Sequence, residues 1–134
     1  MEAREEFILD GIAAHVMDHS MKDLKLEILA KMACMNRFKL SRLFKNRFGQ
    51  TFTSYLNSIR INNAVELFKN PDINITEVAY FVGYRSVRHF NRIFKAVHKI
   101  SPREYRKNKV YYKNNKSGEL NAGKIENRFL NKKR

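Results

Sequence analysis

The sequence predicts an all-α protein, and three observations support this fold class. Glycine and proline are scarce, with 5 and 2 among 134 residues. No segment shows the sustained alternation of apolar and polar residues that marks a half-buried strand. Apolar residues instead recur three and four positions apart along most of the chain, which is the spacing that forms one face of a helix. We therefore expect about seven helices, all within a domain over residues 1–109.

The first half of the chain is expected to hold four helices. Apolar spacing places them at about residues 5–18, 26–33, 37–48 and 53–69. Asn36 is a suitable N-cap for the third helix, and Gly49 is a suitable residue to end it. The fourth helix is the longest, and it must end before the break at Asn70-Pro71-Asp72.

Three shorter helices are expected in the second half. Asn74 followed by Glu77 resembles a capping box, so a helix begins there and stops at Gly83. The next helix runs from about Val87 to Val97, and the last opens with Ser101-Pro102, which supplies a cap and a proline at the first helical position. Residues 110–134 lack a clear period and are expected to form a basic, mobile tail with a short helix at 124–131.

The chain repeats itself at an offset of about 50 residues. Arg42-Leu43-Phe44-Lys45 matches Arg92-Ile93-Phe94-Lys95, and Tyr55 matches Tyr105. Each copy is a short helix, a tight turn and a longer basic helix, which is the helix-turn-helix pattern. We therefore expect two helix-turn-helix subdomains, at about 24–48 and 74–97, joined by the long helix at 53–69 as a linker.

The charge distribution favours a polyanionic partner. The chain has 27 Lys and Arg against 13 Asp and Glu, a net charge of +14, and residues 31–109 alone carry +13 while residues 1–30 carry −4. The polar faces of the two longer helices gather basic and amide side chains, which suit the major groove because Arg pairs with guanine and Asn with adenine. These faces hold Arg37, Lys39, Ser41, Arg42 and Lys45 in the first copy, and Arg85, Arg88, Asn91, Arg92 and Lys95 in the second.

Other functional classes find little support. No apolar run approaches the roughly 18 residues of a membrane span, and the acidic N-terminus is unlike a secretory signal. The single cysteine, Cys34, excludes an intramolecular disulfide framework and a multi-cysteine zinc site, and we expect it to be buried as a small apolar residue. His15 and His19 lack a third metal ligand, and no nucleophile–base pair or phosphate loop is present. We expect no enzyme activity, no cofactor and no metal.

The spaced motifs in residues 74–106 resemble the DNA-binding domain of the AraC/XylS family of bacterial transcription regulators. The residues that carry the resemblance are Asn74-Ile75-Thr76-Glu77-Val78-Ala79, Val82-Gly83-Tyr84, Arg92-Ile93-Phe94-Lys95 and Ser101-Pro102-Arg103-Glu104-Tyr105. The first copy repeats the match, so the resemblance covers about residues 7–107. It implies two recognition helices that enter adjacent major-groove segments of one DNA duplex.

The resemblance also implies roles for single residues. Contacts to bases are expected from Phe38, Ser41, Arg42, Val87, Arg88, Asn91 and Arg92. Contacts to phosphates are expected from Arg37, Lys39, Lys45, Arg85, Lys95 and Arg103. The sequence departs from the family pattern at Lys25 and Arg85, where a capping residue is common, although Ser86 is placed to cap instead. It departs again at Lys99, where a glycine is common: either this lysine adopts a left-handed conformation at a cost of about 1 kcal/mol, or the turn differs.

The expected function is sequence-specific DNA binding that regulates transcription. The resemblance favours an activator that contacts RNA polymerase, works in the bacterial cytoplasm on the nucleoid, and involves neither a membrane nor a small-molecule site in this chain. Two alternatives remain open. A non-specific architectural protein would carry the same charge, and the chain could be the DNA-binding part of a larger effector- or phosphorylation-controlled regulator.

Overall fold

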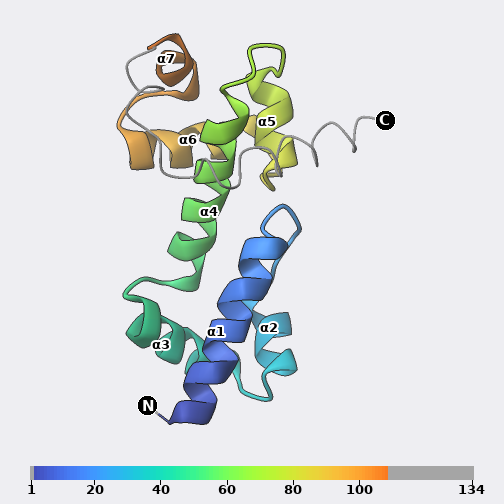
Figure 1. Ribbon diagram of the computed structural model, residues 1–134, viewed down its shortest axis with the longest axis vertical. Coiled ribbons are helices and arrows are strands. Elements are labelled where there is room, and N and C mark those ends of the chain that lie inside the picture. The colour runs from blue at the N-terminus through green and yellow to red at the C-terminus, as the bar shows by residue number, and fades with distance from the viewer. Residues whose placement is uncertain (1, 109–134) are drawn as a thin grey trace. The chain divides into compact units, whose positions relative to one another are not determined.

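The computed structural model describes residues 2–108, and its regular structure is entirely helical (Figure 1). The helices are α1 (Ala3–Asp18), α2 (Leu26–Met32), α3 (Arg37–Phe48), α4 (Phe52–Leu67), α5 (Ile75–Phe81), α6 (Val87–His98) and α7 (Pro102–Lys107). No strand occurs within residues 2–108, which confirms the predicted all-α class. The predicted tail at 110–134, with its helix at 124–131, lies outside the described residues.

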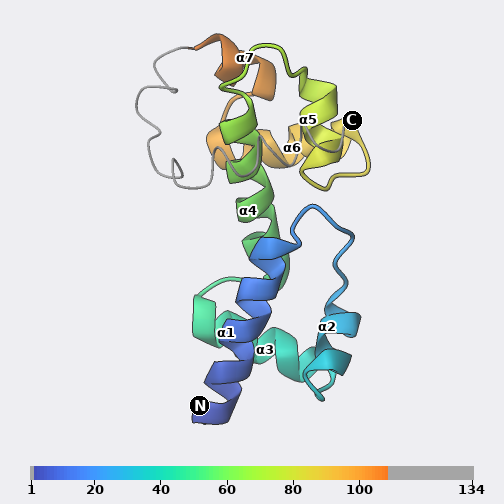
Figure 2. The same ribbon diagram turned by 45° about the vertical axis from the view of Figure 1, so that its right-hand side comes forward.

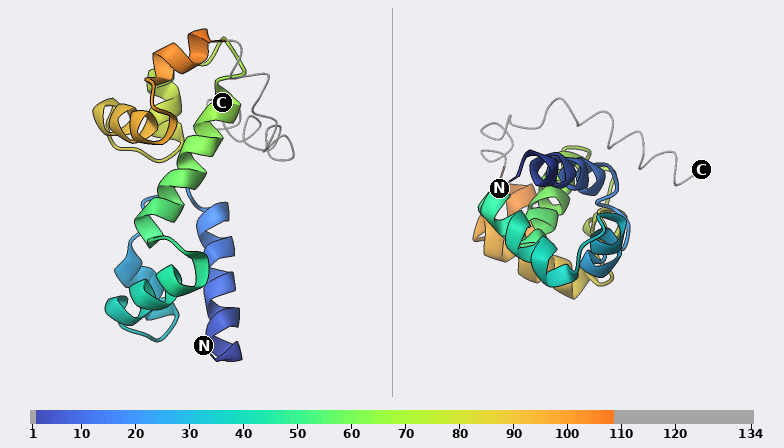
Figure 3. Two further views of the ribbon diagram at one scale, coloured as in Figure 1. Left: turned by 90° about the vertical axis from the view of Figure 1, so that its left-hand side faces the viewer. Right: turned by 90° about the horizontal axis from the view of Figure 1, so that it is seen from below.

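The chain divides into two compact units, with the boundary between Ile59 and Arg60. The first unit holds α1, α2, α3 and the first half of α4 (Figure 3). The second half of α4 belongs to the second unit, together with α5, α6 and α7 (Figure 2). Each unit therefore contains one of the two predicted helix-turn-helix pairs, α2–α3 or α5–α6.

The core of the first unit forms around α3, against which both α1 and α2 pack. Leu40 and Phe44 of α3 are fully buried together with Leu9 and Val16 of α1. Ala30 is buried where α2 contacts α3, and a side chain this small lets the two backbones approach closely. The buried face of α3 thereby fixes which face of this helix remains in solvent.

Both units contain the same cluster of three aromatic rings. In the first unit the Phe44 ring lies 4.6 Å from Phe48 and 5.3 Å from Tyr55, measured between centroids. Fifty residues later, Phe94 lies 4.7 Å from His98 and 5.4 Å from Tyr105. The tyrosine meets the phenylalanine edge-on in both clusters, a favourable geometry for aromatic pairs. The repeat predicted from the sequence is therefore a repeat of core packing.

Side-chain caps begin the helices where the sequence predicted them. Asn36, Asn74, Ser86 and Ser101 each accept a hydrogen bond from the backbone N–H three residues on, at 2.8 to 3.1 Å. Ser86 thus caps α6 in place of Arg85, as the sequence indicated. Lys25 makes no side-chain cap for α2. A cap of this kind typically contributes about 1 kcal/mol, so these four sites fix where the helices start.

Within residues 2–108, two non-glycine residues adopt the left-handed backbone conformation. Lys99 follows α6 with a φ of 69°, matching Gly49 after α3 with a φ of 73°. The turn of the first helix-turn-helix contains Cys34 with a φ of 56°. The prediction that Cys34 is buried is wrong, because it lies in the turn beyond the C-cap of α2 rather than on a packed helix face, and its side chain is exposed.

Candidate nucleic-acid interface

The predicted contact residues lie on the solvent faces of α3 and α6 or directly beside these helices. Leu40, Leu43 and Phe44 bury one face of α3, and Phe90 and Phe94 bury the corresponding face of α6. The exposed residues among those predicted are Arg37, Phe38, Lys39, Ser41, Arg42, Lys45, Arg85, Arg88, Asn91, Arg92, Lys95 and Arg103. Val87 is the exception because it is half-buried. Each helix therefore presents a polar, mostly cationic stripe opposite its core.

An exposed aromatic ring stands at the first turn of α3. Phe38 is 76% exposed, and the guanidinium of Arg37 lies over its ring at 5.4 Å from the centroid. Arg37 in turn donates a hydrogen bond of 2.7 Å to the carboxylate of Glu27 in α2. A large apolar side chain left in solvent at this position is suited to contact with a partner surface such as a thymine methyl group.

Carboxylates of α1 and α2 pair with three cations of α3. Besides the Arg37–Glu27 pair, Lys39 Nζ lies 3.6 Å from Glu5, and the guanidinium of Arg47 donates to both oxygens of Asp10 at 3.1 to 3.3 Å. The hydrogen bond with Asp10, followed by the attraction of its charge, raises the pKa of Arg47. These pairs could not be predicted from local sequence, because the hydrogen-bonded partners are 10 and 37 residues apart. The only sequence feature that indicates such pairing is the excess of acidic residues in residues 1–30.

A shallow groove of about 380 Å³ lies beside the exposed face of α6. Arg92 and Lys95 of α6 form one side, and Arg103 of α7 contributes a third positive charge. The remaining lining residues are Ile75, Asn91, Ser101 and Pro102. Three cations around one open groove produce a local positive potential that attracts an anionic group such as a phosphate.

The pKa of His89 on α6 is lowered from its ordinary value of 6.5. Partial burial is the main reason that the pKa of His89 is lowered, and the nearby charges of Arg92 and Arg60 lower it further. The ring of His89 meets Tyr84 edge-on at 5.2 Å, and burial raises the pKa of Tyr84 to about 12. The positive charge on this face of α6 therefore comes from its arginines and Lys95.

Within residues 2–108 no three His, Cys, Asp or Glu side chains are grouped so that they could hold a metal ion. None of the helices α1 to α7 is both long and apolar enough to cross a membrane.

Comparison with known proteins identifies relatives of this arrangement. The profile of a family described as a helix-turn-helix domain matches residues 29–108. The transcriptional regulator AlkR of Acinetobacter baylyi is 35% identical over 98 residues, which are 73% of this chain and 32% of that protein. The regulator MtrA of Neisseria gonorrhoeae is 33% identical over 99 residues, 74% of this chain and 33% of its own length. This chain thus spans about a third of the length of these relatives.

Solved structures show the same fold. The C-terminal domain of AraT, a response regulator from Geobacillus stearothermophilus, matches with a TM-score of 0.71 and 31% identity, over 75% of this chain and 84% of that one. The DNA-binding domain of AdpA, solved in complex with a target DNA, also matches with a TM-score of 0.71, at 27% identity over 82% of this chain and 97% of that one.

Proposed function

The chain belongs to the family of AraC-type helix-turn-helix regulators, as the sequence resemblance indicated, and we propose that it binds a specific DNA sequence and regulates transcription there. The observation that carries this proposal is the duplicated exposed stripe on two capped, core-packed helices. Arg42 and Lys45 on α3 recur as Arg92 and Lys95 on α6, and all four side chains are exposed. Two such helices can read two groove segments of one duplex.

We assign base reading to the outermost side chains of each stripe. Arg42, Arg88 and Arg92 are suited to the O6 and N7 acceptors of guanine, and Asn91 to the paired donor and acceptor of adenine. Ser41 can hydrogen-bond to several bases, while Phe38 and Val87 offer apolar contact to a thymine methyl group. The half-burial of Val87 limits its reach, so we expect it to contribute least of these residues.

Contacts to the phosphate backbone would then come from the cations beside these stripes. Lys45 and Lys95 lie one turn beyond the base-reading arginines, and Arg103 lines the same groove as Arg92. Arg85 is exposed just before the cap of α6 and completes this set. Such contacts position a recognition helix without reading sequence, and they make binding strongly dependent on salt.

The proposed cellular role is supported by the relatives. AlkR and MtrA are both named as transcriptional regulators, and RhaS of Enterobacter, 31% identical over 98 residues, is named as a transcriptional activator. We therefore propose an activator that contacts RNA polymerase while bound to promoter DNA, within the bacterial cytoplasm and on the nucleoid.

Selection of binding sites from a random DNA library tests the proposal. The library is incubated with the protein at about 150 mM salt, and the enriched sites are then mapped by footprinting. We expect one enriched site with two short conserved blocks about one helical turn, roughly 34 Å, apart. Affinity for this site should exceed affinity for random duplex by about 10³ or more.

The same measurement decides for or against an architectural protein that binds without reading sequence. Such a protein would enrich no site, and its affinity for every duplex would fall together as salt rises. The amide and aromatic side chains on the stripes, Asn91 and Phe38, favour the sequence-reading function because neither adds phosphate attraction.

A further inference from the structure

Two groups of cations on the recognition helices differ in whether they have a carboxylate partner. Arg42 and Lys45 on α3 correspond to Arg92 and Lys95 on α6. Among the residues that the structure describes, no carboxylate lies within ion-pairing distance of any of these four side chains. The two helices thus offer the same pair of uncompensated charges at equivalent positions.

The second group consists of cations that only α3 possesses. Arg37 and Lys39 occur where α6 has Val87 and His89, and each of the two is paired with a carboxylate of the first unit. Glu27 lies 2.7 Å from Arg37, and Glu5 lies 3.6 Å from Lys39. At these two positions α6 carries an apolar residue and a histidine whose pKa is lowered by partial burial and by the charges of Arg92 and Arg60.

The positions of Arg37 and Lys39 make this pairing relevant to DNA. Lys39 precedes Arg42 by three residues and Arg37 precedes Ser41 by four, so both flank the exposed stripe of α3. Arg47, by contrast, follows Leu43 and Phe44 by four and three residues and continues the buried side of the helix. Its partner Asp10 therefore neutralises a charge that points away from the stripe.

We infer that Glu5 and Glu27 limit the sequence-independent attraction of the first unit for DNA by neutralising Arg37 and Lys39. An unpaired cation beside a recognition helix attracts phosphate whatever the sequence, and each phosphate neutralised steepens the salt dependence of binding. With the two carboxylates in place, α3 keeps Arg42 and Lys45 as the cations of its exposed stripe without a carboxylate partner among the described residues, as α6 keeps Arg92 and Lys95 beside Arg88. Arg37 and Lys39 therefore leave the set of phosphate contacts that the family resemblance implied.

The test compares Glu27→Gln, Glu5→Gln and the double variant with Asp10→Asn as the matched control. All three single changes add one positive charge to the full chain, and each breaks one ion pair with α3. Affinity for a random duplex is measured by fluorescence anisotropy at several salt concentrations. We expect Glu27→Gln and Glu5→Gln each to steepen the slope of log K against log salt by about 0.9 and to raise affinity about fivefold at 150 mM salt. The double variant should show about twice the change in slope.

The control separates local neutralisation from net charge. Asp10→Asn should leave the slope near that of the wild type, and an equal increase in all three single variants would overturn the inference. An unchanged slope of log K against log salt in Glu27→Gln and Glu5→Gln would also overturn the inference. Weaker binding to random duplex would overturn it too, provided that the variants melt at the same temperature as the wild type. The inference rests on the proposed DNA binding: a wild-type protein without salt-dependent DNA affinity would refute that function itself.

Discussion

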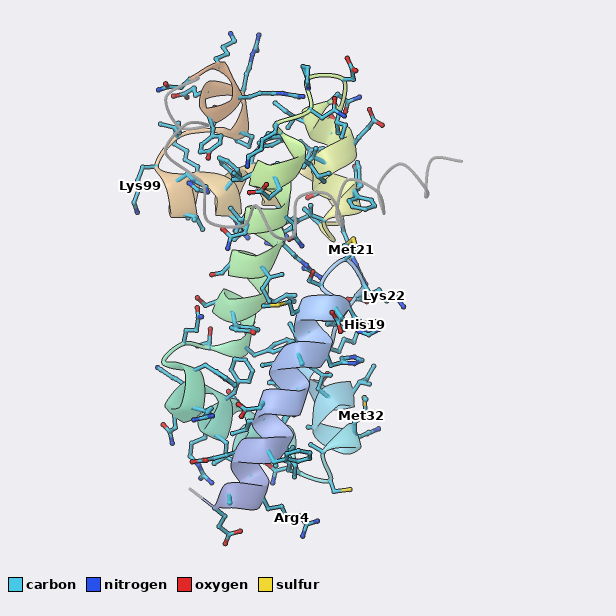
Figure 4. The ribbon with its side chains drawn as sticks, in the orientation of Figure 1. Arg4, His19, Met21, Lys22, Met32 and Lys99 are labelled. Carbon is cyan, nitrogen blue, oxygen red and sulfur yellow. The ribbon has the colours of Figure 1, made fainter. Side chains whose placement is uncertain are left out.

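Lys99 ends helix α6 in a backbone conformation that favours glycine, and it lies at the surface just past this helix (Figure 4). A residue with a Cβ is strained there by about 1 kcal/mol. We expect Lys99→Gly to raise the free energy of unfolding by about 0.5–1 kcal/mol, since glycine relieves that strain but gives the unfolded chain more freedom. The hydrogen bond of 3.1 Å from Lys99 Nζ to the Ala96 carbonyl is exposed and adds little.

Urea unfolding checks this prediction, with Gly49→Ala as the opposite change at the equivalent position. Gly49 has open space around its Cα, so any loss of stability in Gly49→Ala must come from its φ of 73°. A Lys99→Gly variant less stable than the wild type would show that the lysine side chain contributes more than the strain removes.

Arg92 is the residue from which we expect the largest effect on sequence reading. Arg92→Ala should weaken binding to the selected site by about 1–3 kcal/mol and relax the preference at one base position. Binding to random duplex should change less, because phosphate contacts dominate there. Repeating the library selection with the variant measures both effects, and Lys95→Ala provides a neighbouring change that should weaken all sequences alike. Unchanged base preference in Arg92→Ala would contradict the assignment.

For single residues, the sequence predicts the role of a side chain when that role depends only on neighbouring residues in the chain. It does not predict roles that depend on partners distant in the sequence. The cap at Ser86 depends on three residues, and the prediction there is confirmed. The environment of Cys34 depends on the backbone of a turn, and the partners of Lys39 and Arg37 depend on how α1 and α2 pack on α3. No spacing in the sequence reports such packing.

The aromatic cluster at the end of α6 differs from its counterpart in α3 by one imidazole. His98 occupies the place of Phe48, between Phe94 and Tyr105, and its buried Nε2 forms no hydrogen bond with any described residue. Burial lowers the pKa of His98 below its ordinary value of 6.5. The unfolded chain therefore binds more protons just below pH 6.5, so the free energy of unfolding decreases as the pH falls from 6.5 toward the lowered pKa.

We expect His98→Phe to remove this part of the pH dependence. It should also stabilise the protein at pH 5 by about 1 kcal/mol or more, because phenylalanine has no buried polar atom that lacks a hydrogen-bond partner. Thermal unfolding at pH 5 and pH 8 measures the difference. His89 also has a lowered pKa and is retained, so a smaller dependence of the same sign should remain. An unaltered pH profile in His98→Phe would show that His98 is not held neutral.

The elements themselves are largely predictable. Apolar periodicity and the caps at Asn36, Asn74 and Ser101 predict starts for α3, α5 and α7 that agree with the structure. The predicted start of α1, at residue 5, is two residues later than Ala3, because Glu2 makes no side-chain cap that would mark the beginning. Helix α4 ends at Leu67 rather than at 69, since apolar periodicity continues through the buried Phe68 beyond the last helical turn.

For the molecule as a whole, the proposal requires both units to touch DNA in one complex. Lys45→Ala and Lys95→Ala should each reduce the slope of log K against log salt by about one, and the double variant should reduce it by about two. Binding to the selected site, titrated at four salt concentrations, measures these slopes. If one of the single variants leaves the slope unchanged, the assignment of that lysine as a phosphate contact is wrong.

The repeat at an offset of 50 makes the two-unit architecture predictable, because each copy carries its own core pair of aromatic residues. Phe44 packs against Tyr55 in the first unit, and Phe94 packs against Tyr105 in the second. For DNA binding, the sequence predicts which side chains are exposed on the contact surface but not which base each of them contacts. Exposure of Arg42 and Arg92 follows from helical periodicity, whereas the base that each would meet depends on the duplex.

The turn of the first helix-turn-helix offers an experimental handle. Cys34 is the only cysteine of the chain, and its thiol is exposed between α2 and α3. A maleimide fluorophore would therefore attach at one known position, in the first unit alone. Its emission during a DNA titration would follow that unit separately from the second, without any engineered labelling site. Because Cys34 lies in this exposed turn, such a probe would report whether the first unit binds DNA before the second.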